Sequence, residues 1–292
     1  MSKVIGIDLG TTFSAIASLD DLGNPEVLAS IEDNRKITAS AVYLKDNEVI
    51  VGDKALNYLK DQSNNVILQT KREMENDVVY STDEGKWVTD KDLVDAYTPA
   101  QVSSLILKKL KEYTSDVKKV VITVPAMFAE KARQATLDAA KIADLEVIEL
   151  INEPTAAVLH YASLPGVEVG GRVMIFDLGG GTFDVTFAEV KNKKVDVMTS
   201  RGDKYLGGRD FDKEITKLMK KKYFDIHNVE IDIENNKEYI HKAEEVKKIL
   251  SVKDKASIEI NGPKGSQKIE ITQEEFEESI QTYIEKIKML IE

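Results

Sequence analysis

Two stretches of the sequence place an aspartate between an apolar run and a turn rich in glycine and threonine. Asp8 is followed by Leu-Gly-Thr-Thr, and Asp177 is followed by Leu-Gly-Gly-Gly-Thr. Glycines let backbone N–H groups approach an anion closely, as phosphate-binding loops require. A carboxylate repels phosphate, but it can hold the Mg²⁺ ion that neutralises phosphate charge. Each stretch therefore predicts a strand, a tight turn and a returning strand that together could bind a metal-phosphate group.

The two stretches repeat one pattern. With one residue fewer in the first turn, Asp8 aligns with Asp177 and Thr12 aligns with Thr182. Such a repeat indicates an internal duplication and two related lobes. Two facing hairpins could hold one triphosphate between them. The alternative is that both stretches are ordinary β-hairpins.

Composition excludes several classes of function. The chain has 292 residues, 42% hydrophobic and 31% charged, which are values typical of globular proteins. Its net charge of −11 argues against a nucleic-acid partner, which would need a basic face. The absence of cysteine excludes disulfides, thiol catalysis and zinc–thiolate sites. The start of the sequence has no signal-peptide pattern, and no apolar run is long enough to span a membrane, so we expect no membrane association and a cytoplasmic location.

Periodic segments indicate a mixed α/β fold. The polar segment 64–87 favours loops and short strands. The segments after it read as alternating helices and strands, at 99–113, 120–124, 130–143, 146–150 and 152–163. Pro99 and Pro154 suit the first turn of their helices. This alternation predicts a sheet covered by helices.

The last third of the sequence is predicted to form helices and one hairpin. Helices are expected from Gly207-Gly208 to about Phe224 and over residues 236–250, followed by a hairpin that turns through Asn261-Gly262. Thr272 and Glu275 form a capping-box pattern. The pattern predicts one continuous helix from there to the end of the sequence.

Five ordered motifs, at residues 5–14, 121–126, 151–157, 175–184 and 206–211, resemble the ATPase domain of the heat-shock protein 70 (Hsp70) chaperones of the DnaK type. The similarity runs over essentially the whole chain. The resemblance implies an α/β, two-lobed actin-like ATPase fold, with ribonuclease H-like mixed sheets, flanking helices and an incomplete second lobe.

The resemblance also implies domain limits. Lobe I would comprise residues 1–167, with an inner part (1–36 and 95–167) and an outer part (37–94). Lobe II would comprise residues 168–292, with an inner part (168–206) and an outer part (207–285). The turn signals at Leu164-Pro165-Gly166 and Gly170-Gly171 mark the expected joint.

The same resemblance implies site residues. Asp8 and Asp177 would orient a hydrated Mg²⁺ ion, and together with Lys71, Glu153 and Thr182 they would form the catalytic group. The residues expected to contact phosphate are Gly10, Thr11, Thr12, Phe13, Gly179, Gly180, Gly181, Thr182, Gly207 and Gly208. Those expected near adenine and ribose are Glu244, Lys247, Lys248 and Ser251. Pro125 and Arg133 match a proline switch and its arginine.

By this resemblance the chain is the nucleotide-binding part of an ATP-dependent chaperone, with ATP/ADP and Mg²⁺ as cofactors. The implied partners of the parent protein are a J-domain co-chaperone, a nucleotide exchange factor and client peptides, which a C-terminal domain would bind. Two features depart from the family. Position 209 is Arg where the family usually has Glu, and the Gly-Gly-Ser/Thr-Arg-Ile-Pro adenosine motif has no match. We therefore expect weak or absent ATP binding and hydrolysis by this chain alone. The alternatives are an actin-like filament-forming ATPase and a non-hydrolysing interaction module.

Overall fold

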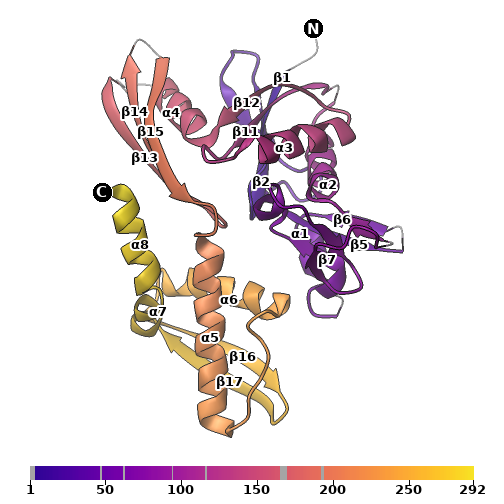
Figure 1. Cartoon of the computed structure of the whole chain (residues 1–292), viewed down its shortest axis with the longest axis vertical. Helices are drawn as coiled ribbons and strands as arrows, with labels where there is room; N and C mark the ends of the chain where they lie inside the picture. Colours follow the sequence, from indigo (N-terminus) through magenta and orange to yellow (C-terminus); the bar gives the residue numbers. More distant parts are fainter. Residues whose placement is uncertain are drawn as a thin grey trace. The chain divides into compact units, whose positions relative to one another are not determined.

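The computed structural model describes residues 4–46, 48–61, 63–93, 95–115, 117–164, 170–191 and 194–292. The chain divides into two compact units (Figure 1). The first unit comprises Met1–Asp177 and Asp184–Lys204, and the second comprises Leu178–Phe183 and Tyr205–Glu292. The expected lobe boundary at 167/168, and the turn signal at Pro165-Gly166, lie outside the described residues, so the lobe limits stay a prediction.

The first unit is built on a six-stranded sheet. Its strands are β1 (Val4–Asp8), β2 (Phe13–Leu19), β3 (Pro25–Val27), β4 (Thr38–Ala39), β11 (Lys119–Val124) and β12 (Glu146–Asn152). The order is β12-β11-β1-β2-β3, and β4 pairs with β2. β1, β11 and β12 run parallel, whereas β2 returns antiparallel to β1. The first aspartate hairpin predicted from the sequence is therefore confirmed, and it lies at the centre of the sheet.

Helices α2 (Pro99–Lys111) and α3 (Glu130–Ile142) supply the apolar partners of this sheet, and α4 (Glu153–Ser163) follows β12. The shared core contains Ile5, Ile7, Val120, Ile122, Leu107, Leu110, Ala139 and Ala140. Helix α2 begins at a capping box of Thr98 and Gln101, with Pro99 in its first turn. The predicted alternation of strands and helices is confirmed.

Short elements fill the segment between β4 and α2. β5 (Ala41–Lys45), β6 (Glu48–Val51) and β7 (Val66–Leu68) form one small sheet, which packs with α1 (Asp53–Leu56). β8 (Val79–Ser81), β9 (Lys86–Val88) and β10 (Ala96–Tyr97) form another. Two 3₁₀ turns, η1 (Ser63–Asn65) and η2 (Thr70–Glu73), lie among them. This arrangement confirms the prediction of loops and short strands there.

A three-stranded sheet carries the second aspartate stretch. Its strands are β13 (Gly171–Leu178), β14 (Phe183–Lys191) and β15 (Lys194–Asp203), with β14 in the middle. Residues 183–186 of β14 are buried on both faces of the strand. Asp177 and Asp184 therefore lie near the two ends of the glycine-rich turn that joins β13 to β14.

The second unit packs two helices on a hairpin. Its elements after the glycine turn are α5 (Gly208–His227), α6 (Lys237–Leu250), β16 (Lys255–Gly262), β17 (Gly265–Thr272), α7 (Gln273–Ser279) and α8 (Gln281–Ile291). The core contains Ile215, Met219, Tyr223, Ala243, Val246, Ile260 and Ile271. Helix α5 packs against α6 and β17, and the hairpin crosses it obliquely in Figure 1.

Two sequence predictions in this unit were wrong. The hairpin turns after Gly262 rather than through it, because Gly262 pairs with Gly265. At that position a Cβ would lie 2.4 Å from the Tyr223 ring, so glycine allows the strand to continue. The last helix is not continuous, since Ile280 (φ −99°, ψ 2°) separates α7 from α8. The Thr272–Glu275 capping box is confirmed.

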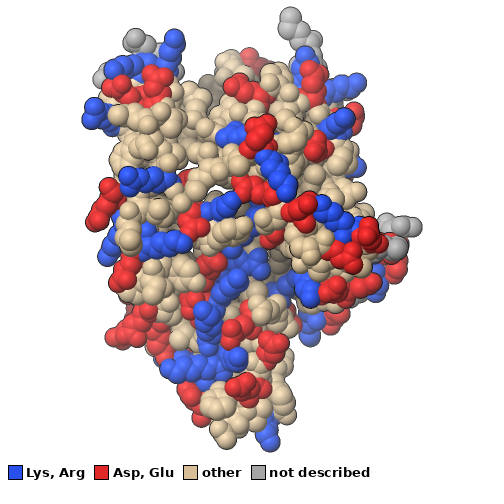
Figure 2. Space-filling view, in the orientation of Figure 1, with Lys and Arg blue, Asp and Glu red and all other residues tan. Residues whose placement is uncertain are grey.

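Charge of both signs covers the face of the molecule shown in Figure 2, where Lys and Arg side chains are interspersed with Asp and Glu. Such mixing is the usual state of a solvated surface. Among the residues described, no helix is both long enough and apolar enough to cross a lipid bilayer.

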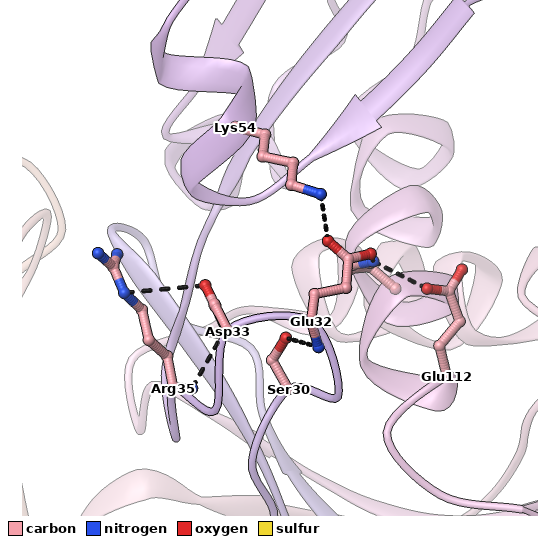
Figure 3. A network of polar contacts seen from close by, with 7 residues as sticks. Ser30, Glu32, Asp33, Arg35, Lys54 and Glu112 are labelled. Atoms are coloured by element: carbon pink, nitrogen blue, oxygen red, sulfur yellow. Dashed lines mark hydrogen bonds and ion pairs between the residues drawn. The ribbon is translucent and has the colours of Figure 1, made fainter.

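An ion-pair network joins the loop after β3 to two helices (Figure 3). Glu32 accepts from Lys54 of α1 at 2.5 Å and from Lys109 of α2 at 2.6 Å, and Lys109 also pairs with Glu112. The backbone N–H of Glu32 donates to Ser30 Oγ. Lys109, followed by Lys54, lowers the pKa of Glu32 to about 2. The network therefore fastens this loop to the helical layer.

We expect Glu32→Gln to lower the free energy of unfolding by about 0.5–1 kcal/mol at pH 7, a small value because solvent screens a side chain that is 40% exposed. The folded pKa lies below the ordinary value, so this stability exists above about pH 4.5 and is lost as pH falls towards 2. Denaturant unfolding across this range checks it. Glu84→Gln, which removes a more exposed pair with Lys86, is the control. A loss of unfolding free energy in Glu32→Gln that is the same at pH 2 as at pH 7 would contradict this role of Glu32.

Candidate functional site

Asp8 ends β1, and a threonine on the neighbouring strand fixes its carboxylate. The parallel register places Asp8 opposite Thr123 of β11. Thr123 Oγ1 donates a hydrogen bond of 2.8 Å to Asp8 Oδ1. The sequence did not identify Thr123 as a site residue, because only the register between strands 115 positions apart brings the two together.

The turn after Asp8 is shaped by glycine and two buried serines. A Cβ at Gly10 would lie 2.0 Å from Phe13 O, so only glycine fits. The Gly10 N–H donates to Ser14 Oγ at 3.2 Å, and Ser40 Oγ donates to Gly10 O at 2.8 Å. The two serine hydroxyls are 2.9 Å apart. The backbone of the predicted phosphate turn is therefore fixed by the protein itself.

Lys71 and Glu153, 82 positions apart, form a largely buried ion pair. Lys71 lies in η2, and Glu153 is the first residue of α4. Lys71 Nζ lies 2.5 Å from Glu153 Oε1, with the two side chains only 8% and 17% exposed. The Lys71 ammonium also lies 6.0 Å from the centre of the Phe128 ring. The structure thus joins two residues that the resemblance assigned to one catalytic group.

Negative charge exceeds positive charge around this pair. Burial acts to lower the pKa of Lys71, but Glu153, Asp8 and Asp177 together raise it above its ordinary value. Burial raises the pKa of Glu153 and of Asp177, and Asp8 adds to both shifts. Burial, reinforced by Glu153 and Asp177, raises the pKa of Asp184 to about 7. One ammonium therefore faces several carboxylates, all within the first unit.

Asp184 is the residue that sequence reasoning left without a role. It is 3% exposed, and its Oδ1 has no hydrogen-bond partner among the described residues. A buried carboxylate oxygen without a partner is costly unless a cation or donor reaches it. The signal in the sequence was its position after Thr182-Phe183 in the motif, but only the fold shows its burial.

The acidic group fits a hydrated magnesium ion. Mg²⁺ binds through one or two carboxylates and keeps several water ligands. Within the described part of the chain, no three acidic or histidine side chains form a ready-made metal cluster. Asp8 and Asp177 are the residues that would hold such an ion, and its charge would offset their mutual repulsion.

The second unit carries the glycine residues of the other predicted phosphate turn. Gly179 N–H donates to Thr182 O at 2.9 Å, which closes the turn. The start of α5 packs on it, because Gly208 N–H donates to Gly179 O and Arg209 N–H donates to Gly180 O, both at 2.9 Å. A Cβ at Gly207 would lie 2.7 Å from Gly181 N. The glycine groups predicted separately at 179–181 and 207–208 thus form one contact.

Lys247 braces this contact from α6. Its Nζ donates to Gly208 O at 2.9 Å and lies 2.7 Å from Asp212 Oδ1. Burial raises the pKa of Asp212 to about 6, and Lys247 opposes that shift. The structure therefore gives Lys247 contacts with the glycine turn, whereas the resemblance assigned it to the adenosine.

The other predicted adenosine residues lie on the same helix. Glu244 pairs with Lys248 at 3.0 Å, and hydrogen bonding to His241, followed by Lys248, lowers the pKa of Glu244 to about 2. Ser251 Oγ donates to Lys247 O at 3.1 Å. These residues share the last two turns of α6 and its C-cap, and their contact with a nucleotide stays a prediction.

Arg209 stands where the resemblance expects Glu. The burial of Lys237, followed by the nearby charge of Arg209, lowers the pKa of Lys237 to about 7. The start of α5 is therefore more basic here than the family pattern implies.

Arg133 links the turn after Pro125 to the residue before Glu153. Its Nε donates to Phe128 O at 3.0 Å, and its Nη2 donates to Asn152 Oδ1 at 2.6 Å. Phe128 N–H in turn donates to Pro125 O. The two predicted switch residues are thus joined through one turn to the start of α4.

The buried Asp184 generates a pH prediction for the metal-free protein. Its folded pKa is raised from 3.8 to about 7, so ionisation destabilises the fold as pH rises through this range. Asp184→Asn removes that effect. In the presence of a chelator, we expect the variant to gain on the order of 3 kcal/mol relative to wild type between pH 4 and pH 8. Denaturant unfolding measures the difference, and a difference independent of pH would contradict the assignment.

Comparisons with known proteins agree with these motifs. The family model described as Hsp70 protein matches residues 4–292. Chaperone protein dnaK of Thalassiosira pseudonana is 35% identical over all of this chain and 52% of its own length. Chaperone protein DnaK of Mycoplasmopsis agalactiae is 42% identical over 80% of this chain and 37% of its own length. The chain therefore spans about half, or less, of the length of these relatives. It has the α/β fold of the family, and it belongs to the Hsp70 family, DnaK type.

Proposed function

We propose that the chain is the nucleotide-binding part of an ATP-dependent chaperone and that the parent protein binds and hydrolyses Mg²⁺-ATP to ADP and phosphate, with weak or absent activity in this chain alone. The observation that carries the proposal is the buried Lys71–Glu153 pair with Asp8 and Asp177 in its electrostatic neighbourhood. Phosphoryl transfer to water depends chiefly on positioning and charge stabilisation, which such a group provides.

Each candidate site residue of the first unit that follows has a proposed role. Asp8, oriented by Thr123, and Asp177 hold the hydrated metal ion, which neutralises phosphate charge when it is bound. Lys71 stabilises the negative charge that develops on the transferred phosphoryl group. Glu153 holds the Lys71 ammonium in place, so little reorganisation is needed when the reaction occurs.

The glycine turns have the proposed task of binding phosphate. In the first unit the proposed phosphate-binding residues are Gly10, Thr11, Thr12 and Phe13. In the second unit they are Gly179, Gly180, Gly181, Thr182, Gly207 and Gly208. Support comes from backbone geometry, because side chains at Gly10 and Gly207 would collide with neighbouring backbone atoms. Fixed turns of this kind present N–H groups to anions.

The helix α6 is the proposed contact for adenosine. Glu244, Lys248 and Ser251 lie at its C-terminal end. Lys247 would stabilise the start of α5 through its hydrogen bond to the Gly208 carbonyl.

The activity of the whole protein is also a proposal. The relatives carry the name chaperone, and by analogy ATP turnover would drive binding and release of client peptides by a further domain. A J-domain co-chaperone and a nucleotide exchange factor are the proposed partners, in the cytoplasm. The family match favours this function over an actin-like filament.

We expect Lys71→Ala in the full-length protein to remove about 2–4 kcal/mol of transition-state stabilisation, which is the effect of losing one preorganised donor. The single-turnover rate of ATP hydrolysis should fall roughly thirty- to a thousand-fold. Lys109→Ala is the matched control, since Lys109 is also shielded and ion-paired but lies in the Glu32 network. An unchanged rate in Lys71→Ala would reject the catalytic role.

A further inference from the structure

Glu75 makes two contacts that the proposed chemistry does not explain. It follows η2 and lies four residues after Lys71. Its Oε1 accepts a hydrogen bond of 3.1 Å from the Ala129 N–H. Its Oε2 forms an ion pair with Lys204 Nζ. The Glu75 side chain is 17% exposed, whereas that of Lys204 is 44% exposed, so the carboxylate is shielded from water more than its partner is.

The first contact caps a helix that lacks its own capping side chain. Helix α3 starts at the N-cap Ala129, whose side chain cannot accept a hydrogen bond. In a capping box, a carboxylate from within the helix binds the N-cap N–H, and a negative charge there also suits the helix dipole. Glu75 fills this place from another part of the chain. The turn that carries Lys71 is thereby fastened to the start of α3.

The surroundings of Lys71 belong to the same block. Met74, between Lys71 and Glu75, is buried with Val124, Phe128 and Ala132. Phe128, adjacent to the Glu75-bound Ala129, faces the Lys71 ammonium. From the Phe128 carbonyl, the Arg133 hydrogen bonds continue to Asn152, the residue before Glu153. Movement of Glu75 would therefore change the surroundings of both Lys71 and Glu153.

The second contact links this block to the end of the three-stranded sheet. Lys204 directly follows β15 and is the last residue of the first unit. Three residues further along the chain, Gly207 begins the contact with the glycine turn. The ion pair thus ties the Lys71 turn to the strand end that leads into that segment.

We propose that Glu75 is a positioning residue for Lys71 and that it acts together with Lys204. This inference rests on the proposed ATPase function only for its effect on rate. Glu75 itself does not touch the reacting groups. It holds the Lys71 turn against α3 and β15, and so keeps the ammonium in its place on Glu153.

Two substitutions test the pair in the full-length protein. Glu75→Gln keeps an acceptor for the Ala129 N–H but loses the charge that attracts Lys204, and Lys204→Met keeps an apolar stem without the charge. Each should lower the single-turnover rate of ATP hydrolysis about three- to tenfold, because a small misplacement of a catalytic group is costly. The KM for ATP should change less than about twofold, because the phosphate turns are unaltered.

A double variant and a control variant distinguish a positioning role of Glu75 from a general loss of structure. The double variant should be no slower than either single variant, because both substitutions remove the same ion pair. Asp77→Asn, which removes the exposed ion pair with Lys91, should leave the rate unchanged. Rates equal to wild type in both single variants, or losses that multiply in the double variant, would overturn the proposal.

A second measurement does not depend on hydrolysis. Acetic anhydride modifies lysine amines according to their accessibility, and mass spectrometry reads the extent at each lysine. We expect Glu75→Gln and Lys204→Met to raise modification of Lys71 at least threefold, with Lys109 unchanged as the internal reference. If wild type hydrolyses no ATP, the proposed function fails, yet this measurement still decides the role of Glu75. Unchanged labelling of Lys71 would overturn it.

Discussion

The buried ion pair of Lys71 and Glu153 is the contact on which the first unit's candidate site depends. Removing either partner would leave an uncompensated charge in a poorly solvated place, which costs about 3–5 kcal/mol in typical proteins. Yet the one positive charge of Lys71 does not balance this group, since Asp8, Asp177 and Asp184 add negative charge to that of Glu153. The site is therefore organised around one lysine and an excess of carboxylates, an arrangement that suits a divalent cation and a phosphorylated ligand.

Backbone geometry supplies the second constraint. Gly10 lies too close to Phe13 O for any side chain, and Gly207 lies too close to the backbone of Gly180 and Gly181. Buried serines hold the first turn, and Lys247 holds the second through the Gly208 carbonyl. Both turns are thus shaped by protein contacts alone, which reduces the ordering that a bound phosphate group would have to impose.

Local patterns in the sequence predicted the two aspartate hairpins, the Thr272–Glu275 capping box and the α/β alternation, because turn residues and periodicity act over a few positions. They also identified Lys71 and Glu153 through a resemblance of motifs. They could not find Thr123, Ser40 or the Glu75–Lys204 pair, since each depends on strand register or on contacts between distant segments. The break at Ile280 was missed because the apolar period continues through it.

We propose that Asp8 and Asp177 serve one metal-dependent nucleotide site. Titration calorimetry of ATP into the full-length protein, with and without Mg²⁺, tests it most directly when wild type is compared with Asp8→Asn, Asp177→Asn and the double variant. The account predicts that Mg²⁺ strengthens ATP binding to wild type, that each single variant loses most of this gain, and that the double variant loses little more. Binding that is indifferent to Mg²⁺, or two independent and additive losses, would contradict it.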